Sequence, residues 1–209
     1  MDLRFLTILI CAAVLAGCAV GNKYDYRAGT AKLPPTANSI AIGVVDTRAY
    51  VLSGDTSPRF VGFQQDGYGN AFEVTTTSGA PLSNDFAKAL STSFARGGAT
   101  VDLAPIAPGT PVSEGVQSLQ GLGTDRVLLL EMREWKTDVL ADIKVHWNLT
   151  ARVYDGSGRL LADENSQGIE GTGHLGDILG TEKAQLAVGE ASRRLSELLS
   201  RPTITSALQ

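Results

Sequence analysis

The sequence has 209 residues, a formal net charge of −4, 43% hydrophobic residues and 19% charged residues. This length is enough for one globular domain with a proper hydrophobic core. Because Lys and Arg do not outnumber Asp and Glu, we expect no nucleic acid among the partners. Two cysteines and two histidines also argue against a disulfide framework and a His-rich metal centre, so we expect no metal ligands.

The amino terminus has the composition of a secretory signal peptide. Arg4 is followed by an apolar run over residues 5–16, which contains Cys11. This run is shorter than the about 20 residues that a membrane-spanning helix needs, and small residues stand at its end. An ordinary cleaved signal or a core helix is the alternative interpretation.

The motif Leu15-Ala16-Gly17-Cys18 resembles the lipobox of bacterial lipoproteins. The resemblance implies that residues 1–17 are removed and that the Cys18 thiol is the lipid attachment site, with palmitate-type acyl chains. Two or more such chains hold a protein stably on a membrane. Ala19 stands where an aspartate is the usual signal for retention in the inner membrane. The resemblance therefore favours the outer membrane, with the protein facing the periplasm.

The mature chain divides into three predicted parts. Its first stretch contains Gly, Lys and Pro without apolar periodicity, which predicts a flexible tether that extends to about 65 Å at roughly 3.4 Å per residue. Tyr24 and Tyr26 leave open the alternative that this stretch packs on the domain. The predicted parts are the lipidated cysteine and tether at 18–37, a single α/β lipoprotein domain at 38–200 and a C-terminal tail at 201–209.

The first half of the domain reads as short strands and one helix. Residues 40–45 are apolar on both sides, which indicates a central strand. Glycines and an Asp-Gly pair join two β-rich runs, at 59–63 and 71–77, into a hairpin. Apolar residues at every fourth position predict a helix from Leu82, with Ser83 as its N-cap and Gly97-Gly98 as its end. A short strand at 99–103 follows.

The second half contains the clearest alternation in the chain. Residues 143–154 alternate apolar and polar side chains, which is typical of a strand with one wet face. The predicted elements are a short helix at 112–122, a three-stranded meander at 125–169 and a helix at 182–200 that Pro202 ends. All the elements together predict an α+β fold, a mixed and largely antiparallel sheet with two or three helices packed on one face.

Several short segments resemble the YajG-like family of uncharacterised bacterial lipoproteins. They are Val44-Val-Asp-Thr-Arg48, Arg59-Phe-Val-Gly62, Gly67-Tyr-Gly-Asn70 and the helix from Leu82. The order of elements over residues 38–200 is also similar to that family. The segment Gly121-Leu-Gly-Thr-Asp125 is similar to a turn in several envelope lipoproteins, including auxiliary lipoproteins of ABC-type transport systems. These resemblances imply a location and a fold, and they bring no activity or catalytic residues.

One glycine motif and the two histidines are the candidates for chemistry. Gly171-Thr-Gly-His-Leu-Gly176 matches a dinucleotide-binding pattern, but it ends an antiparallel meander, so we interpret it as a loop and expect no cofactor. His146 or His174 could serve a Ser-His-Asp hydrolase, but the sequence has no G-x-S-x-G elbow, and an exposed structural role is favoured. Asp138 and Asp142 are more typical of a hairpin turn than of a calcium site.

Two pairs of large side chains allow two interpretations each. Trp147 shares its strand face with apolar residues, so core packing is favoured for Trp135 and Trp147 over an exposed aromatic patch. Arg193-Arg194 is typical of a solvated helix face rather than of an anion site.

The sequence therefore predicts a lipid-anchored outer-membrane lipoprotein that faces the periplasm and has no enzymatic activity. We expect membrane attachment through acyl chains on Cys18 and binding to a periplasmic or envelope protein, or support of an envelope assembly. One alternative is an auxiliary lipoprotein subunit of an ABC-type envelope lipid transport system. Another is a periplasmic hydrolase that uses His146 or His174.

Overall fold

In the computed structural model, the described residues are 23–37, 39–65, 68–140, 142–174 and 180–209. They form one eight-stranded sheet and five α-helices. In chain order the elements are β1 (Lys23–Tyr24), the 3-10 helix η2 (Tyr26–Ala28), β2 (Ser39–Asp46), α2 (Ala49–Leu52), β3 (Phe60–Gln65), β4 (Ala71–Thr76), α3 (Leu82–Arg96), β5 (Thr100–Leu103), α4 (Val112–Gln120), β6 (Arg126–Val139), β7 (Asp142–Asp155), β8 (Leu160–His174), α5 (Gly180–Leu199) and α6 (Pro202–Leu208).

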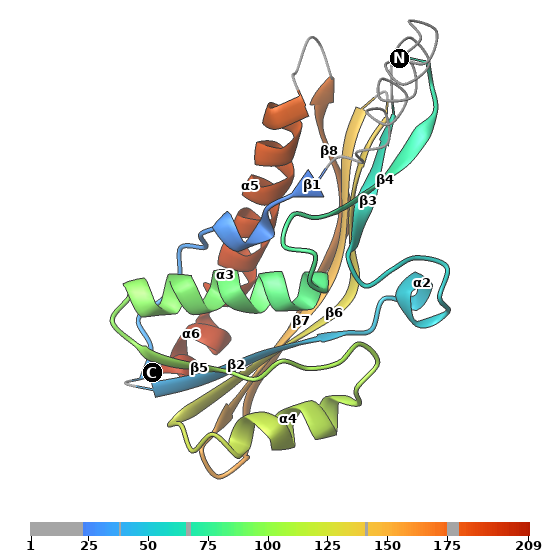
Figure 1. The fold of residues 1–209 in the computed structure, drawn as a ribbon. Helices are drawn as coiled ribbons and strands as arrows, with labels where there is room; N and C mark the ends of the chain where they lie inside the picture. Colours follow the sequence, from blue (N-terminus) through green and yellow to red (C-terminus); the bar gives the residue numbers. More distant parts are fainter. Residues whose placement is uncertain (1–22, 38, 66–67, 141, 175–179) are drawn as a thin grey trace, which may run out of the picture.

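Strand β6 organises the sheet (Figure 1). One edge of β6 pairs antiparallel with β7 along its length, and β7 pairs antiparallel with β8. The other edge is shared, because β2 lies parallel to β6 from Arg126 to Met132 and β3 meets β6 at Val139. Strand β5 flanks β2, whereas β4 flanks β3 and β1 flanks β4 at the far edge. The sheet is therefore mixed, and the predicted central strand, hairpin and three-stranded meander are confirmed.

The described residues form five α-helices, which cover both faces of the sheet, and this corrects the prediction of two or three helices packed on one face. Helices α3, α5 and α6 lie on the face that carries Leu128 and Leu130, whereas α4 covers the opposite face against Val127 and Leu129 (Figure 1). Successive residues of β2 and of the first half of β6 are apolar, so both faces of these strands need cover.

The ends of the helices agree with most of the predicted signals. Gly97 stands at the C-cap of α3, and Gly121 stands at the C-cap of α4. The N-cap of α3 is Pro81, without a side-chain hydrogen bond, so the capping role predicted for Ser83 is wrong. Ser83 lies one residue inside the helix, where its side chain is buried.

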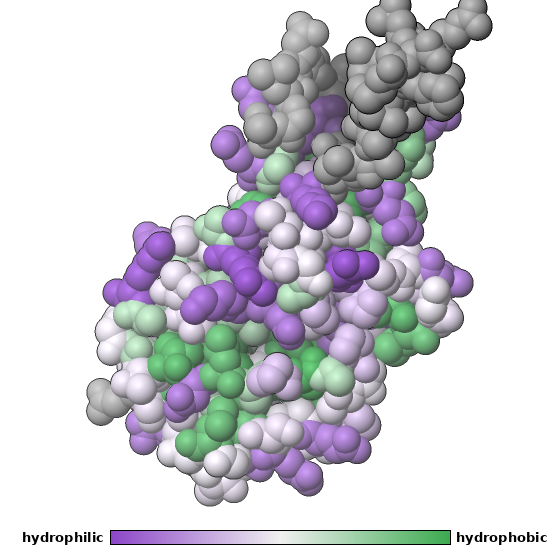
Figure 2. Space-filling model, viewed as in Figure 1, coloured by the Kyte–Doolittle hydropathy of each residue, from purple (hydrophilic) through white to green (hydrophobic). Residues whose placement is uncertain are grey.

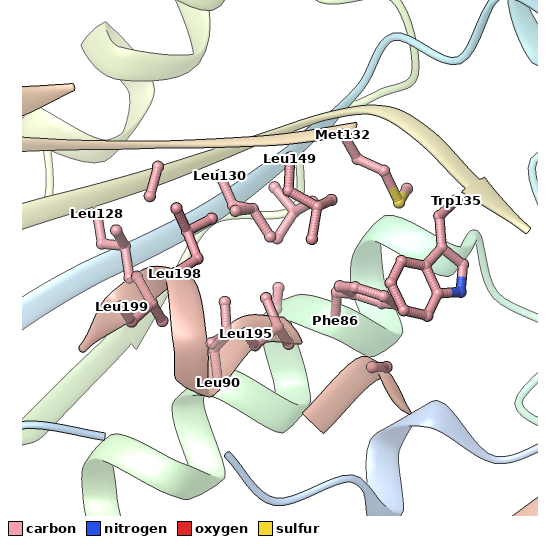
Figure 3. Packing of buried hydrophobic residues seen from close by; sticks show 14 of the residues in the cluster. Phe86, Leu90, Leu128, Leu130, Met132, Trp135, Leu149, Leu195, Leu198 and Leu199 are labelled. Carbon is pink, nitrogen blue, oxygen red and sulfur yellow. The ribbon is translucent and has the colours of Figure 1, made fainter. Parts of the chain in front are cut away.

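The larger core fills the space between the sheet and helices α3 and α5 (Figure 3). Phe86 of α3 points to Trp135 of β6, and their ring centroids lie 5.1 Å apart. Leu195 of α5 and Leu130 of β6 belong to the same cluster. Burying one such side chain contributes about 1.5–3 kcal/mol, so this cluster is the main source of stability. Among the described residues, no helix is both long enough and apolar enough to span a membrane.

The packed chain starts earlier than the predicted boundary at residue 38. Tyr24 and Tyr26 are buried, and Arg27 Nε donates a hydrogen bond of 2.7 Å to Asp85 Oδ1 of α3. Residues 23–37 are therefore docked on the domain rather than extended as a tether, which was the alternative that the two tyrosines left open. Two aromatic residues give no periodic signal, so the sequence pattern underestimates this contact.

The packed chain also continues beyond the predicted boundary at residue 200. Pro202 ends α5 as expected, but it also begins α6, where a proline in the first turn is favourable. Helix α6 buries Ile204 and Leu208 in the larger core. Residues 201–209 are thus part of the domain rather than a tail.

Candidate functional site

The lipobox residues, Leu15, Ala16, Gly17 and Cys18, lie outside the described residues, so their role stays a prediction. The described chain begins at Lys23, five residues after Cys18. Five residues span at most about 17 Å. An anchor on Cys18 would therefore hold the folded domain close to a membrane surface, in contrast to the long tether that the composition predicts.

A buried ion pair lies at the end of β2, close to the point where β3 replaces β2 as the neighbour of β6. Arg48 Nη2 is 2.7 Å from Asp46 Oδ2, and both side chains are fully buried. The Arg48 guanidinium also donates hydrogen bonds to the carbonyl oxygens of Pro58, Phe60 and Trp135. Arg48 thus connects backbone carbonyl groups of β3, of β6 and of the loop before β3 through charge-assisted hydrogen bonds.

Gly62 allows the same junction to close. Its φ is +143°, and a Cβ atom at this position would overlap the backbone of Thr137 in β6. Only glycine combines this backbone conformation with so close an approach. Arg48 and Gly62 therefore both have a structural role in this chain.

His146 lies on the polar face of β7 and is partly buried. Its Nε2 atom is 3.5 Å from Asp138 Oδ2, and Lys136 Nζ is 3.1 Å from the same oxygen. Burial and the charge of Lys136 lower the pKa of His146, although Asp138 opposes them. Among the hydrogen bonds of the described residues, none joins His146 to a serine or threonine. The geometry of His146 is therefore that of a polar strand face, in line with the structural interpretation.

The second histidine and the glycine motif stand at the end of β8. The His174 backbone pairs with Asp142, whereas His146 lies four residues further along β7, about 13 Å away. Residues 171–174 continue an antiparallel strand, although a dinucleotide site needs a turn between a parallel strand and a helix. The rest of the motif and the side chains of His174 and Asp142 lie outside the described part.

An ion-pair network covers the outer face of the meander. Glu131 accepts hydrogen bonds of 2.8 Å from Arg133 and 2.9 Å from Arg152, and Arg152 also pairs with Asp163 of β8. Burial alone would raise the pKa of Glu131, but the hydrogen bonds from the two arginines outweigh it and lower the pKa. The Glu131 carboxylate is therefore charged at neutral pH and links three strands, rather than acting as an acid.

The two tryptophans lie opposite each other across β6 and β7, and both are buried, so the predicted core packing is confirmed. The prediction for Arg194 is wrong, because its guanidinium is buried 3.6 Å above the Trp147 ring and pairs with Glu170 of β8. Arg193 is partly exposed and pairs with Glu190 on the same helix. Cation–π stacking on an indole compensates the burial of Arg194, which helical spacing alone does not reveal.

An open groove lies between the N-terminal segment and the first half of α5. Its volume is about 500 Å³, and its walls include Ala28, Thr30, Ala184, Val188 and Gly189. These side chains are small or apolar, and a Cβ atom on Gly189 would meet nothing within 4 Å. The volume falls in the range of small-ligand pockets, so this groove is a candidate for a binding site in the described chain.

The face of the molecule in Figure 2 carries polar side chains across its middle. Hydrophobic side chains show mainly in the lower half and at α2, where Leu52 is exposed. Single exposed hydrophobic residues are ordinary on protein surfaces, so they define no site by themselves. Within the described residues, no group of three His, Cys, Asp or Glu side chains is placed to hold a metal ion.

No family model and no curated protein matches this sequence, so the resemblance to YajG-like lipoproteins stays a prediction. Among solved structures, protein XCC0632 from Xanthomonas campestris, described with the family model DUF330, is similar with a TM-score of 0.52. The two sequences are 13% identical, over 85% of this chain and 91% of that chain. Because the identity is so low, this likeness shows a shared fold.

Two further solved structures have lower TM-scores. Lipoprotein GNA1162 from Neisseria meningitidis is 14% identical over 77% of this chain and 99% of that chain, with a TM-score of 0.36. The PelC dodecamer from Paraburkholderia phytofirmans is 15% identical over 83% of this chain and 94% of that chain, with a TM-score of 0.42.

Proposed function

We propose that this chain is a lipid-anchored protein of the bacterial cell envelope, held on the periplasmic face of the outer membrane by acyl chains on Cys18. The motif Leu15-Ala16-Gly17-Cys18, which stands five residues before the first packed strand, carries this proposal. Two or more acyl chains on Cys18 give stable attachment without a membrane-spanning helix. Ala19, in place of an aspartate, favours the outer membrane.

The folded domain acts without catalysis, by binding a periplasmic or envelope protein. Its buried charged groups support this proposal, because Arg48 and Arg194 make contacts that stabilise the fold. His146 pairs with a carboxylate that also holds a lysine, an arrangement suited to a strand surface.

The anchor is tested by metabolic labelling with a palmitate analogue in a bacterial host. The wild-type protein should incorporate the label, and Cys18→Ser should lose it because serine offers no thiol for lipidation. Cys11→Ser is the matched control, since Cys11 lies in the segment that is removed, and this variant should stay labelled. Label on Cys18→Ser would show that the lipobox interpretation is wrong.

The partner is tested by crosslinking in intact envelopes, followed by mass spectrometry of the captured proteins. We expect one dominant envelope or periplasmic protein, captured by the wild-type chain at native expression. Absence of any reproducible partner from several crosslinking positions on the domain would contradict a binding role.

The groove beside α5 favours a second function, that of an auxiliary lipoprotein in an envelope lipid transport system. Such a subunit would offer an apolar groove to an acyl chain, and Ala184, Val188 and Gly189 supply such walls. A fluorescent fatty acid should bind the purified domain, and Gly189→Leu should weaken this binding at least tenfold by filling the groove. Ser118→Leu, on the exposed face of α4, is the control; equal binding by both variants would exclude this function.

A further inference from the structure

The position of β1 shows from which end of the molecule the chain arrives. Strand β1 pairs in parallel with β4, with Lys23 opposite Thr75 and Tyr24 opposite Thr76. Because the strands are parallel, the chain before Lys23 comes from the end where β4 starts, at Ala71. In Figure 1 this is the upper end, where β3, β6 and β8 finish and where α5 begins.

The length of the intervening chain limits how far an anchor on Cys18 can lie from this end. Cys18 is five residues from Lys23, which gives a reach of at most about 17 Å. Thr75 is four residues from Ala71, a distance of about 13 Å along β4. An acylated Cys18 therefore reaches the level of Ala71, where β4 starts, when the chain is extended, with little length to spare.

The same end of the sheet exposes large hydrophobic side chains. Gln64 of β3 pairs with Phe72 of β4 and with Val139 of β6, so Phe72 and Leu140 stand at nearly the same level. The exposed fractions are 95% for Tyr68, 52% for Phe72 and 43% for Leu140. We call Tyr68, Phe72 and Leu140 the sheet tip. A tyrosine ring with an aliphatic and an aromatic neighbour is a combination suited to a membrane–water interface.

We propose that the sheet tip contacts the bilayer to which the chain is anchored, so that the domain stands upright with α4 and α6 away from the lipid. This inference rests on the proposed lipidation of Cys18. The anchor makes the contact of the tip with the bilayer an intramolecular event, so even weak insertion of three side chains is well populated. The contact leaves the opposite end of the sheet accessible to a partner.

The test is fluorescence quenching on the full lipoprotein reconstituted in vesicles of phosphatidylethanolamine and phosphatidylglycerol. The mature chain has no cysteine besides Cys18, so one label can be attached at each of Tyr68→Cys, Phe72→Cys and Leu140→Cys. Leu122→Cys is the matched control. Leu122 is 41% exposed, similar to Leu140. Leu122 precedes the start of β6 and Leu140 follows its end, and the strand between them is about 43 Å long.

We expect a quencher dissolved in the lipid to reduce the fluorescence of the three tip labels at least threefold more than that of the Leu122→Cys label. Equal quenching at both ends would overturn the proposed orientation. Flotation of the same samples with the vesicles reports the anchor separately. Protein that floats but has water-exposed tip labels contradicts only this inference, whereas protein that does not float contradicts the proposed lipidation.

Discussion

At the scale of single residues, we expect the buried ion pair of Asp46 and Arg48 to matter most for the stability of the fold. Arg48→Met would leave the buried Asp46 carboxylate without its charged partner and would remove the guanidinium hydrogen bonds to three carbonyl groups, so we expect a loss of about 3–5 kcal/mol in the free energy of unfolding. Chemical denaturation monitored by circular dichroism measures this loss. Arg159→Met removes an exposed ion pair and should leave the midpoint nearly unchanged. Equal midpoints for the two variants would contradict the role of Arg48.

His146 predicts a dependence of stability on pH. Its pKa in the folded protein lies below the ordinary value of 6.5, because burial and Lys136 disfavour the charged imidazole. Below pH 6.5 the unfolded chain therefore binds a proton more readily than the folded chain, and stability falls until the folded pKa is passed. His146→Gln should reduce this loss between pH 7 and pH 5 in thermal unfolding. An unchanged or steeper pH profile in the variant would show that His146 does not contribute in this direction.

At the scale of elements, the N-terminal segment depends on its contact with α3. Arg27→Ala would leave the buried Asp85 carboxylate with Ser78 as its side-chain partner among the described residues. We therefore expect the N-terminal segment to detach more readily, because its docking loses about 1–2 kcal/mol. Chymotrypsin, which cuts at Tyr24 and Tyr26, should then cleave native protein several times faster. Lys88→Ala, on the exposed face of α3, serves as the control. Equal cleavage rates for both variants would contradict docking through Arg27.

Most of the elements could be predicted from the sequence because their signals are local and periodic. The alternation over 143–154 predicts β7, and the apolar spacing from Leu82 predicts α3. The continuous apolar run of β2 predicts that both faces of this strand are buried. The sequence does not show which helix packs on the second face. Helix α4 packs there, through Val116 and Leu119.

The parts that the sequence could not predict depend on contacts between distant segments. Tyr26 meets Trp135 and Phe86 only after folding, and Arg194 finds the Trp147 ring in the same way. The sequence gives only a weak indication of the contacts of Arg48, namely the charged residues Asp46 and Arg48 at the end of an apolar strand. The partners of Arg48 on β3 and β6 are 12 or more residues away, so its role becomes visible only in the folded chain.

At the scale of the whole molecule, the proposed sorting to the outer membrane predicts a role for the residue after Cys18. Ala19→Asp introduces the usual inner-membrane retention signal of enterobacteria-like systems. We expect this variant to move from the outer-membrane to the inner-membrane fraction of a sucrose gradient in such a host. Ala19→Ser should stay with the outer membrane as a control. Ala19→Asp protein that remains in the outer membrane would contradict the proposed sorting, but not the anchor.

The docked N-terminal segment also changes the expected distance between the domain and the bilayer. The composition of residues 18–37 predicts a tether of about 65 Å, whereas Lys23, where the packed chain begins, is only the fifth residue after Cys18. With the proposed acyl chains on Cys18, the domain would be held within about 17 Å of its anchor and close to the membrane surface. This short connection is why the side chains at the upper end of the sheet matter for the orientation of the molecule.

The most direct test of the central claim is the intact mass of the protein purified from bacterial envelopes. The account predicts a mature chain that begins at Cys18 and carries the added mass of the acyl groups, three in the usual form of this lipoprotein class. A mature chain that begins at any other residue, or that begins at Cys18 without acyl groups, would contradict it.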